Sequence, residues 1–216
     1  IGGLAAGIAH EIRNPLASIS GSIQLIMDSN RSRDDGDEQK LMRIMLKEID
    51  RLNFLISDFL DYARPSVIEK RPVLIAKLLQ ETADLVRFNT KLRPDVELEM
   101  RLSDDVQLMG QPDKLKQAFL NILLNAYQAV EKTNHPKVIV SCGMEGGKIL
   151  VRVSDNGVGI AKDSIKRIFE PFHTTKQKGT GLGLAITYKV IENHNGRVYV
   201  ESELGRGTTF NLEFAA

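Results

Sequence analysis

The chain has a single cysteine, Cys142, among its 216 residues, so an intramolecular disulfide framework is excluded and a reducing compartment is favoured. No apolar run is long enough to span a membrane, and no secretory leader pattern occurs at the start. The 29 basic and 28 acidic residues nearly cancel, which argues against broad electrostatic binding of nucleic acid or a membrane surface. We therefore expect this segment to be cytoplasmic. Because the chain begins with Ile1, we interpret it as the C-terminal piece of a longer protein.

Two apolar stripes with helical spacing occupy the first 64 residues. The first comprises Leu4, Ile8, Ile12, Leu16, Ile19, Ile23 and Ile26, and the second comprises Leu41, Met45, Ile49, Leu52, Ile56 and Phe59. The polar segment 30–38 predicts a connection between two helices, and Pro65 disfavours a helical conformation at Arg64. One hairpin cannot bury two broad stripes, so we expect a homodimer through residues 1–64 in which two hairpins form a four-helix bundle.

The pattern changes near residue 67. It predicts helices over 74–88, 111–131 and 182–194, with Pro112 in the first turn of the second and Gly196 ending the third. Strands are predicted over 96–102, 137–144, 148–155, 197–203 and 208–214, with a hairpin turn at 145–147. Helices combined with mostly antiparallel strands predict an α/β sandwich, in which helices cover one face of a sheet. The predicted fold class is therefore α+β, with a helical hairpin domain at 1–66 and a second domain at 67–216.

Two glycine-rich segments lie in the second domain. They are "SDNGVGI" at 154–160, after a strand, and "KGTGLGLAI" at 178–186, which leads into a helix. Neither matches a P-loop or a dinucleotide fingerprint, and either can be only a tight turn. The second favours phosphate binding, because the start of a helix presents free N–H groups and the positive end of the helix dipole.

Two asparagines, Asn121 and Asn125, lie four residues apart on one face of the predicted helix 111–131. Their amides can be satisfied by backbone groups alone. Alternatively they provide oxygen ligands for Mg²⁺ without adding negative charge beside a triphosphate.

His10 lies about 200° around its helix from Ile8, at roughly 100° per residue, which places it opposite the apolar stripe. Glu11 is adjacent, Asn14 follows one turn later on nearly the same face, and Pro15 weakens the helix there. A buried structural histidine is therefore disfavoured, which leaves a surface residue or a reactive one.

Six motifs together resemble the sensor histidine kinases of two-component systems. "AHEIRNPLASI", "NILLNAYQAV", "SDNGVGI", "FEPFHTTK", "GTGLGLAI" and "GRGTTF" occur in the order of that family's H, N, G1, F, G2 and final glycine–threonine boxes. The resemblance runs from about residue 4 to residue 212. "FLDYARP" is similar to the nitrogen-regulation and pilus-regulation subgroup.

The resemblance implies a Bergerat-type ATP site, the fold shared with gyrase, Hsp90 and mismatch-repair ATPases, with ATP and Mg²⁺ as cofactors. Asp155 would accept a hydrogen bond from the adenine amino group, Thr208 would support the base from the other side, and Asn125 would hold Mg²⁺ with help from Asn121. The further residues implied in nucleotide binding are Gly157, Gly159, Ile160, Thr174, Thr175, Lys176, Gly179, Thr180, Gly181, Leu182, Gly183 and Leu184. Lys176 and Lys178 are equally well explained as solvated charges of a lid over 169–180.

The same resemblance implies that His10 is the phosphoacceptor and that Glu11 is a base or orienter for its imidazole. Asn14 would support a phosphatase activity by positioning water against a phosphoaspartate. The implied partner is the receiver domain of a response regulator, and the longer protein is implied as a candidate inner-membrane sensor.

Two alternatives remain beside the kinase. One is an ATPase of the gyrase or Hsp90 type without phosphohistidine, which would need a water-activating carboxylate, and none lies between Asn121 and Asn125. The other is a non-catalytic dimeric scaffold, which intact His10, Asn125 and Asp155 argue against.

Overall fold

A computed structural model describes residues 2–28, 35–63, 69–88, 93–174 and 181–215. The chain divides into two compact units, Ile1–Arg64 together with Thr174–Leu182, and Pro65–His173 together with Gly183–Ala216. No helix in the described ranges is long and apolar enough to cross a lipid bilayer.

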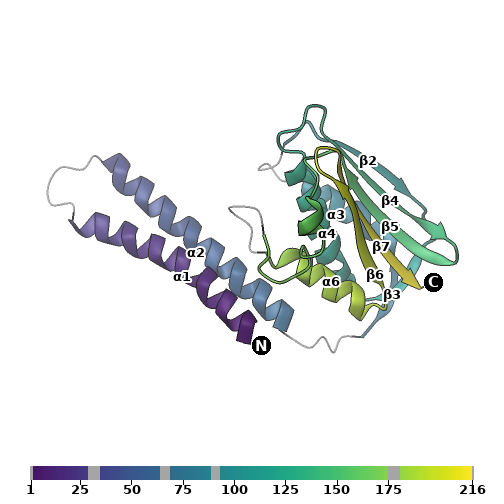
Figure 1. The fold of residues 1–216 in the computed structure, drawn as a ribbon, viewed down its shortest axis with the longest axis horizontal. Helices are drawn as coiled ribbons and strands as arrows, with labels where there is room; N and C mark the ends of the chain where they lie inside the picture. Colours follow the sequence, from purple (N-terminus) through teal and green to yellow (C-terminus); the bar gives the residue numbers. More distant parts are fainter. Residues whose placement is uncertain (1, 29–34, 64–68, 89–92, 175–180, 216) are drawn as a thin grey trace. The chain divides into compact units, whose positions relative to one another are not determined.

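The first unit contains a hairpin of two long helices, α1 (Gly2–Asp28) and α2 (Asp35–Ala63) (Figure 1). Both predicted helices are confirmed, and α1 continues through Pro15. The predicted connection over 30–38 is wrong at its end, because residues 35–38 already belong to α2. Three of those four residues are acidic, and negative charge in a first turn stabilises a helix through its dipole.

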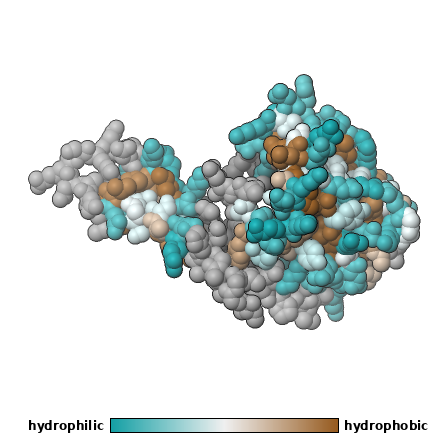
Figure 2. Space-filling view, in the orientation of Figure 1, coloured by the Kyte–Doolittle hydropathy of each residue, from teal (hydrophilic) through white to brown (hydrophobic). Residues whose placement is uncertain are grey.

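The hairpin completely buries few of its described side chains. On α1, Pro15 and Ser22 are buried and Ile19 is half-buried, whereas Leu16 is 51% exposed. On α2, Leu46 is 62% exposed. The further large apolar side chains exposed on the two helices are Ile23, Leu25, Met42, Ile44, Ile49 and Ile56. Figure 2 shows an apolar band on the visible face of the hairpin. Pairing of the two helices therefore leaves apolar surface in contact with water.

The second unit is built on a five-stranded sheet with the strand order β2-β4-β5-β7-β6. Its strands are β2 (Glu97–Leu102), β4 (Lys137–Glu145), β5 (Lys148–Asp155), β6 (Arg197–Glu203) and β7 (Gly207–Ala215). Strand β2 runs parallel to β4, and the other pairs are antiparallel. Helices α3 (Ile75–Arg87), α4 (Pro112–Ala129) and α6 (Gly183–Asn193) cover one face of this sheet (Figure 1). The predicted α/β sandwich is confirmed.

Three short elements were not predicted. Strands β1 (Arg71–Leu74) and β3 (Gln107–Gly110) form a separate two-stranded antiparallel sheet, and α5 (Lys162–Ile165) is a single helical turn. Leu74, which the pattern places in a helix, is the last residue of β1. Strands of four residues are too short to reveal a period of two.

The core lies between the helices and the sheet. Alternate residues of β5 and β7 point to the helices, so that Val151 pairs with Leu212 and Val153 with Phe210 across the two strands. From α4, the side chain of Phe119 is fully buried. Burying a side chain of this size contributes about 1.5–3 kcal/mol. This face is apolar until its last row, which carries the candidate site.

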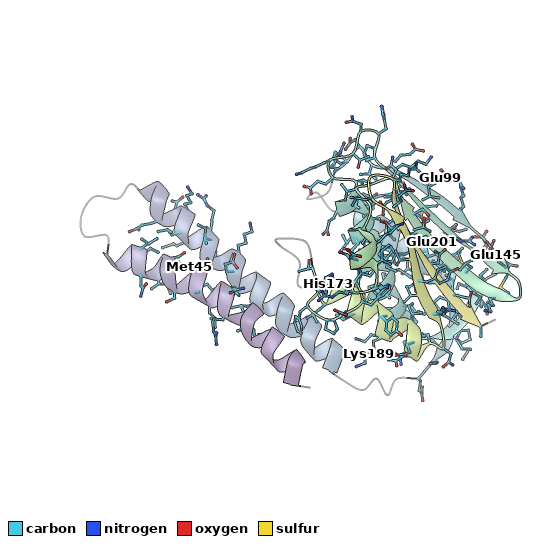
Figure 3. The ribbon with its side chains drawn as sticks, viewed as in Figure 1. Met45, Glu99, Glu145, His173, Lys189 and Glu201 are labelled. Atoms are coloured by element: carbon cyan, nitrogen blue, oxygen red, sulfur yellow. The ribbon has the colours of Figure 1, made fainter. Side chains whose placement is uncertain are left out.

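The opposite face of the sheet is polar. Glu99 forms ion pairs with Arg101 at 2.6 Å and with Lys137 at 2.9 Å, and these cations lower the pKa of Glu99 to about 2. Glu145 pairs with Arg152 at 2.6 Å. Figure 3 labels Glu99, Glu145 and Glu201 on the sheet. Ion pairs between neighbouring side chains therefore stabilise this face.

The end of α6 corrects one prediction. The helix was predicted to run to residue 194 and ends at Asn193, and the residue that adopts a left-handed conformation after it is Asn195, with φ 55°. The N–H of Gly196 reaches back to the carbonyl oxygen of Ile191 at 2.9 Å, as in a Schellman motif. Gly196 lacks a side chain for a different reason, since a Cβ there would lie 2.7 Å from Phe214.

Candidate functional site

A row of three polar residues crosses three strands on the helix-covered face of the sheet. Asp155 on β5 is the direct cross-strand partner of Thr208 on β7, and Thr208 is in turn the partner of Ser202 on β6. Directly opposed residues of neighbouring strands share one face, so the three side chains lie side by side. The row lies at one end of the sheet, where β5 ends and the first glycine segment begins. It therefore borders the apolar core.

Asp155 is held in place by the turn that it begins. Its carboxylate Oδ1 accepts a hydrogen bond from the N–H of Gly157 at 2.9 Å, and only 9% of the residue is exposed. The next residue, Asn156, accepts from the N–H of Lys137 at 2.8 Å and donates to the carbonyl of His135 at 2.9 Å. These bonds tie the end of β5 to the start of β4 and so fix the direction of the Asp155 carboxylate.

The glycines of the first segment are required by packing against the protein itself. A Cβ on Gly157 would lie 2.5 Å from the carbonyl of Ala129 at the end of α4. Gly159 has φ +70°, and its Cβ would lie 2.1 Å from the carbonyl oxygen of Glu203. The segment is therefore clamped between the end of α4 and the turn after β6. That these glycines also let the backbone approach a base stays a prediction.

Ser202 connects this segment to the polar row. Its Oγ accepts a hydrogen bond from the N–H of Ile160 at 2.8 Å, donates to the carbonyl of Gly207 at 2.8 Å, and lies 2.9 Å from the hydroxyl of Thr208. Ser202 is not among the residues predicted from the sequence. The turn centred on Gly205 could have revealed it, because hairpin register places Ser202 opposite Thr208.

The second glycine segment meets α4 through Asn121. Its side-chain Nδ2 donates to the carbonyl of Gly183, the first residue of α6, at 3.0 Å. Thr187 donates to the same carbonyl at 2.9 Å. At least one amide of the asparagine pair is thus satisfied by backbone. Asn125, one turn further along α4, is half-buried.

The remaining residues predicted around the phosphates are only partly described. Gly181 adopts φ +67°, Leu182 is buried, Leu184 is half-buried and Thr174 is exposed. Thr175, Lys176, Gly179 and Thr180 lie outside the described residues, as does Lys178. At the start of the predicted lid, the ring of Phe169 packs against Tyr188 of α6 with centroids 5.6 Å apart.

The predicted phosphoacceptor lies on α1. The backbone of His10 and Glu11 is helical, but their side chains lie outside the described part of the chain. Asn14, one turn later, is exposed, and Pro15 is buried. Exposure of Asn14 agrees with the outward face predicted for it, whereas the direction of His10 stays a prediction.

The predicted protein ligand for Mg²⁺ is Asn125. Among the described residues, no group of three or more histidine, cysteine, aspartate or glutamate side chains could hold a metal. An asparagine oxygen supplemented by phosphate oxygens and water suits Mg²⁺, which keeps much of its hydration in proteins. Asn125 therefore fits the predicted role without a cage of carboxylates.

His194 is a buried histidine that ties the same two helices together. Its Nδ1 lies 2.7 Å from the carbonyl of Val190, and its Nε2 accepts the N–H of Gln111 at 2.9 Å. Because Nε2 accepts, the proton resides on Nδ1 and the ring is neutral. Burial lowers the pKa of His194, with Val190 opposing this and Lys70 reinforcing it. Gln111 precedes α4, so this contact and the Asn121–Gly183 bond fix α6 against α4 at two points.

Comparisons with known families decide what this arrangement belongs to. Residues 1–66 match the His Kinase A (phospho-acceptor) domain, and residues 110–216 match the family of histidine kinase-, DNA gyrase B- and HSP90-like ATPases. The chain belongs to the sensor histidine kinases. An ATP-binding domain of this family is therefore present, and the predicted family and fold are confirmed. The nitrogen- or pilus-regulation subgroup stays a prediction.

Sequence relatives match nearly the whole of this chain. It is 38% identical over 213 residues to sporulation kinase E of Bacillus subtilis, covering 98% of this chain and 28% of the relative. It is also 38% identical to the sensor histidine kinase ZraS of Escherichia coli K12, covering 98% of this chain and 45% of the relative. The chain thus spans less than half the length of either relative.

Solved structures agree with this assignment. Histidine kinase ThkA in complex with the response regulator protein TrrA matches with a TM-score of 0.81 and 26% identity, over 99% of this chain and 61% of that one. The mycobacterial sensor histidine kinase MprB matches with a TM-score of 0.60 and 27% identity, over 67% of this chain and 96% of that one.

Proposed function

We propose that this chain is the catalytic part of an ATP-dependent protein histidine kinase, which phosphorylates His10 and passes the phosphoryl group to an aspartate of a response regulator. The observation that carries the proposal is the cross-strand pair of Asp155 and Thr208 at the polar edge of the core. The same chain carries His10 within a region that matches a phospho-acceptor domain. We assign residues 1–66 to dimerisation and phosphotransfer and residues 67–216 to ATP binding.

ATP lies with its base at the polar row and its phosphates toward the start of α6. The fixed carboxylate of Asp155 accepts a hydrogen bond from the adenine amino group, and would repel the carbonyl of guanine. The N–H groups at the start of α6 and the glycine segment before it receive the phosphates. Asn125 would hold Mg²⁺, which would supply positive charge to neutralise the phosphate oxygens. Thr174, Thr175, Lys176, Gly179 and Thr180 belong to the same phosphate-binding segment.

His10 is the nucleophile. Its neutral imidazole nitrogen forms a bond to the γ-phosphorus while the bond from that phosphorus to the bridging oxygen of ADP breaks. Glu11 accepts or orients the imidazole proton, which raises the nucleophilicity of the ring. The phosphoryl group then moves from His10 to the aspartate carboxylate of a receiver domain. The similarity of the chain to a kinase whose structure was solved with a response regulator supports this partner.

Asn14 supports the reverse reaction. It is exposed on α1 one turn after His10, where its amide can position a water molecule against a phosphoaspartate. Asn14→Ala should therefore slow dephosphorylation of the receiver while leaving phosphorylation of His10 intact. Unchanged dephosphorylation would remove this part of the proposal.

A second copy of the chain covers the apolar surface of the hairpin. Among the described side chains of α1 and α2, eight large apolar ones are more than a third exposed, and burying them in a four-helix bundle supplies the driving force for dimerisation. Light scattering should return a dimer at micromolar concentration. Leu46→Asp should shift it toward monomer, whereas Tyr199→Asp, on the polar face of the sheet, should not. A stable wild-type monomer would contradict the proposed dimer.

The phosphoryl acceptor is tested with γ-labelled ATP and Mg²⁺. The wild-type chain should retain acid-labile, alkali-stable label, His10→Gln should retain none, and His135→Asn, which alters an exposed histidine in a turn, should behave as wild type. Phosphate release that persists in His10→Gln without retained label would favour the ATPase. Absence of both label and nucleotide binding would favour the scaffold.

A further inference from the structure

The hydroxyl of Ser202 has three partners but only one proton. The carbonyl oxygen of Gly207 can only accept, so the bond at 2.8 Å uses the Ser202 proton. The backbone N–H of Ile160 can only donate, so its bond at 2.8 Å uses one Ser202 lone pair. The remaining partner is the hydroxyl of Thr208 at 2.9 Å. Because Ser202 has no second proton, Thr208 must donate, and it takes the last lone pair.

The direction of this bond fixes what Thr208 can offer to a ligand. Its only hydroxyl proton points to Ser202, so its oxygen presents lone pairs to any other neighbour. Asp155, its cross-strand partner, is a carboxylate and presents only acceptors as well. Thr208 is 3% exposed, which makes an unmatched contact costly.

We propose that Ser202 is a positioning residue for base selectivity: by holding the Thr208 proton away from the site, it leaves a row of acceptors that prefers a base with an amino group over one with a carbonyl. This inference rests on the proposed ATP site. Asp155 alone repels a carbonyl, but a freely rotating Thr208 hydroxyl could donate to that carbonyl and offset the repulsion. Ser202 removes this option.

Removal of the Ser202 hydroxyl therefore has a consequence that loss of stability alone would not produce. Without it, the Thr208 proton is free to turn toward the ligand and to donate to a carbonyl. Discrimination against a carbonyl-bearing base should then weaken, even if both nucleotides bind less tightly because the loop at Ile160 has lost an anchor. The effect must disappear when Thr208 has no hydroxyl.

The experiment uses ADP and IDP, which carry an amino group and a carbonyl, respectively, at the six-position of the purine. IDP also carries a proton on N1, so the effect of the Thr208 hydroxyl is isolated by comparing Ser202→Ala with and without that hydroxyl. Dissociation constants for both are measured by calorimetry, with Mg²⁺, on the full chain. Wild type should bind ADP more tightly. Ser202→Ala should lower the ratio Kd(IDP)/Kd(ADP) by about tenfold, the effect of one regained hydrogen bond of about 1.4 kcal/mol. In a chain that already carries Thr208→Val, adding Ser202→Ala should leave the ratio unchanged.

Two further variants serve as controls. Ser202→Thr keeps a hydroxyl on β6 and should keep the wild-type ratio. Ser154→Ala removes the hydroxyl–hydroxyl contact between Ser154 and Thr209, at 2.9 Å on the opposite face of the same strands, and should also keep it. Thermal unfolding of each variant confirms that it is folded.

The outcomes separate the inference from the function on which it rests. An unchanged ratio in Ser202→Ala, or an equal fall when Thr208→Val is present, would overturn the role of Ser202 while leaving the ATP site intact. Failure of the wild-type chain to bind ADP would overturn the proposed site itself.

Discussion

The side-chain amide of Asn121 donates a hydrogen bond to the carbonyl oxygen of Gly183 at 3.0 Å, and so joins the middle of α4 to the first residue of α6. The start of α6 is where we place the phosphates. The position of the proposed phosphate end of the site therefore depends on this amide, together with the contact between His194 and Gln111 at the other end of α6. In this fold, Asn121 positions the helix, whereas a role of Asn125 as a ligand of Mg²⁺ stays a prediction.

Replacement of Asn121 by aspartate tests this arrangement. A carboxylate oxygen would face the Gly183 carbonyl in place of the N–H donor and would add negative charge near the phosphates. We expect a loss of about 1–3 kcal/mol in the free energy of unfolding and at least roughly tenfold weaker ADP binding. Denaturant unfolding and calorimetry measure the two effects. Asn134→Asp, the same change in an exposed turn, should alter neither, and equal behaviour of the two variants would contradict the proposed role.

Gly207 and Gly205 form a matched pair in the turn between β6 and β7. Both have positive φ, 109° and 80°, but a Cβ on Gly207 would lie 1.9 Å from the carbonyl oxygen of Asp155, whereas Gly205 has open space. Gly205→Ala should cost about 1 kcal/mol from backbone conformation alone. Gly207→Ala should cost at least about 3 kcal/mol, because β7 must also move away from β5. If chemical denaturation gave similar losses in unfolding free energy for the two variants, the close approach of Gly207 to the carbonyl of Asp155 would not be rigid.

His194 should make the stability of the ATP-binding unit sensitive to acid. Burial lowers its pKa below the ordinary value of 6.5, so the unfolded chain binds a proton more readily than the folded one. The stabilisation from neutral His194 is complete above pH 6.5 and is lost as the pH falls below it. The loss is confined to the pH range between 6.5 and the lowered pKa of folded His194, and its slope there is at most about 1.4 kcal/mol per pH unit.

A neighbouring positive charge also lowers the pKa of His194. Lys70, whose Nζ bonds the carbonyl of Asn193 at 2.7 Å, adds positive charge near the ring. Unfolding titrations between pH 7.5 and 5.5 should show the decline in wild type and a shallower decline in His194→Gln. His135→Asn should follow wild type. Identical slopes for wild type and His194→Gln would assign the acid sensitivity to other groups.

Cys142 should be unreactive in the folded protein. It is 4% exposed on β4, and burial raises the pKa of its thiol to about 11, so almost no thiolate is present at pH 8. Because thiolate is the reactive form, iodoacetamide should label the chain only in denaturant. The sequence has no other cysteine, so mass spectrometry reports on this site alone. Rapid labelling of the native chain at pH 8 would contradict the burial of β4.

Long periodic segments and boxed motifs could be read from the sequence because their signals are local. The helices near 4–27 and 112–129 follow their apolar spacing, and Asp155 is marked by the glycines after it. Strand β1 could not be predicted, because its four residues adopt an extended conformation through pairing with β3, more than 30 residues away in the chain.

The polar contacts that complete the site were hidden for a related reason. Ser202 gains its importance from the register of β6 on β7, and His194 gains it from the backbone of Gln111, 83 residues earlier in the chain. A serine in a strand and a histidine near a helix end look ordinary until their partners are known. The left-handed conformation of Asn195 was not predicted, and packing against Phe214 explains the glycine that follows it.

The strand order also has a consequence for how the chain is made. Strand β7 lies between β5 and β6, yet it is the last of the three to be synthesised. When β6 leaves the ribosome, it therefore has no neighbouring strand to pair with. At that stage Asp155, at the end of β5, also lacks its cross-strand partner on β7. When β7 emerges, it pairs with both β5 and β6 and brings Thr208 beside Asp155, which completes the adenine end of the proposed site in one step. A nascent chain should consequently acquire affinity for nucleotide late and abruptly, rather than in proportion to its length.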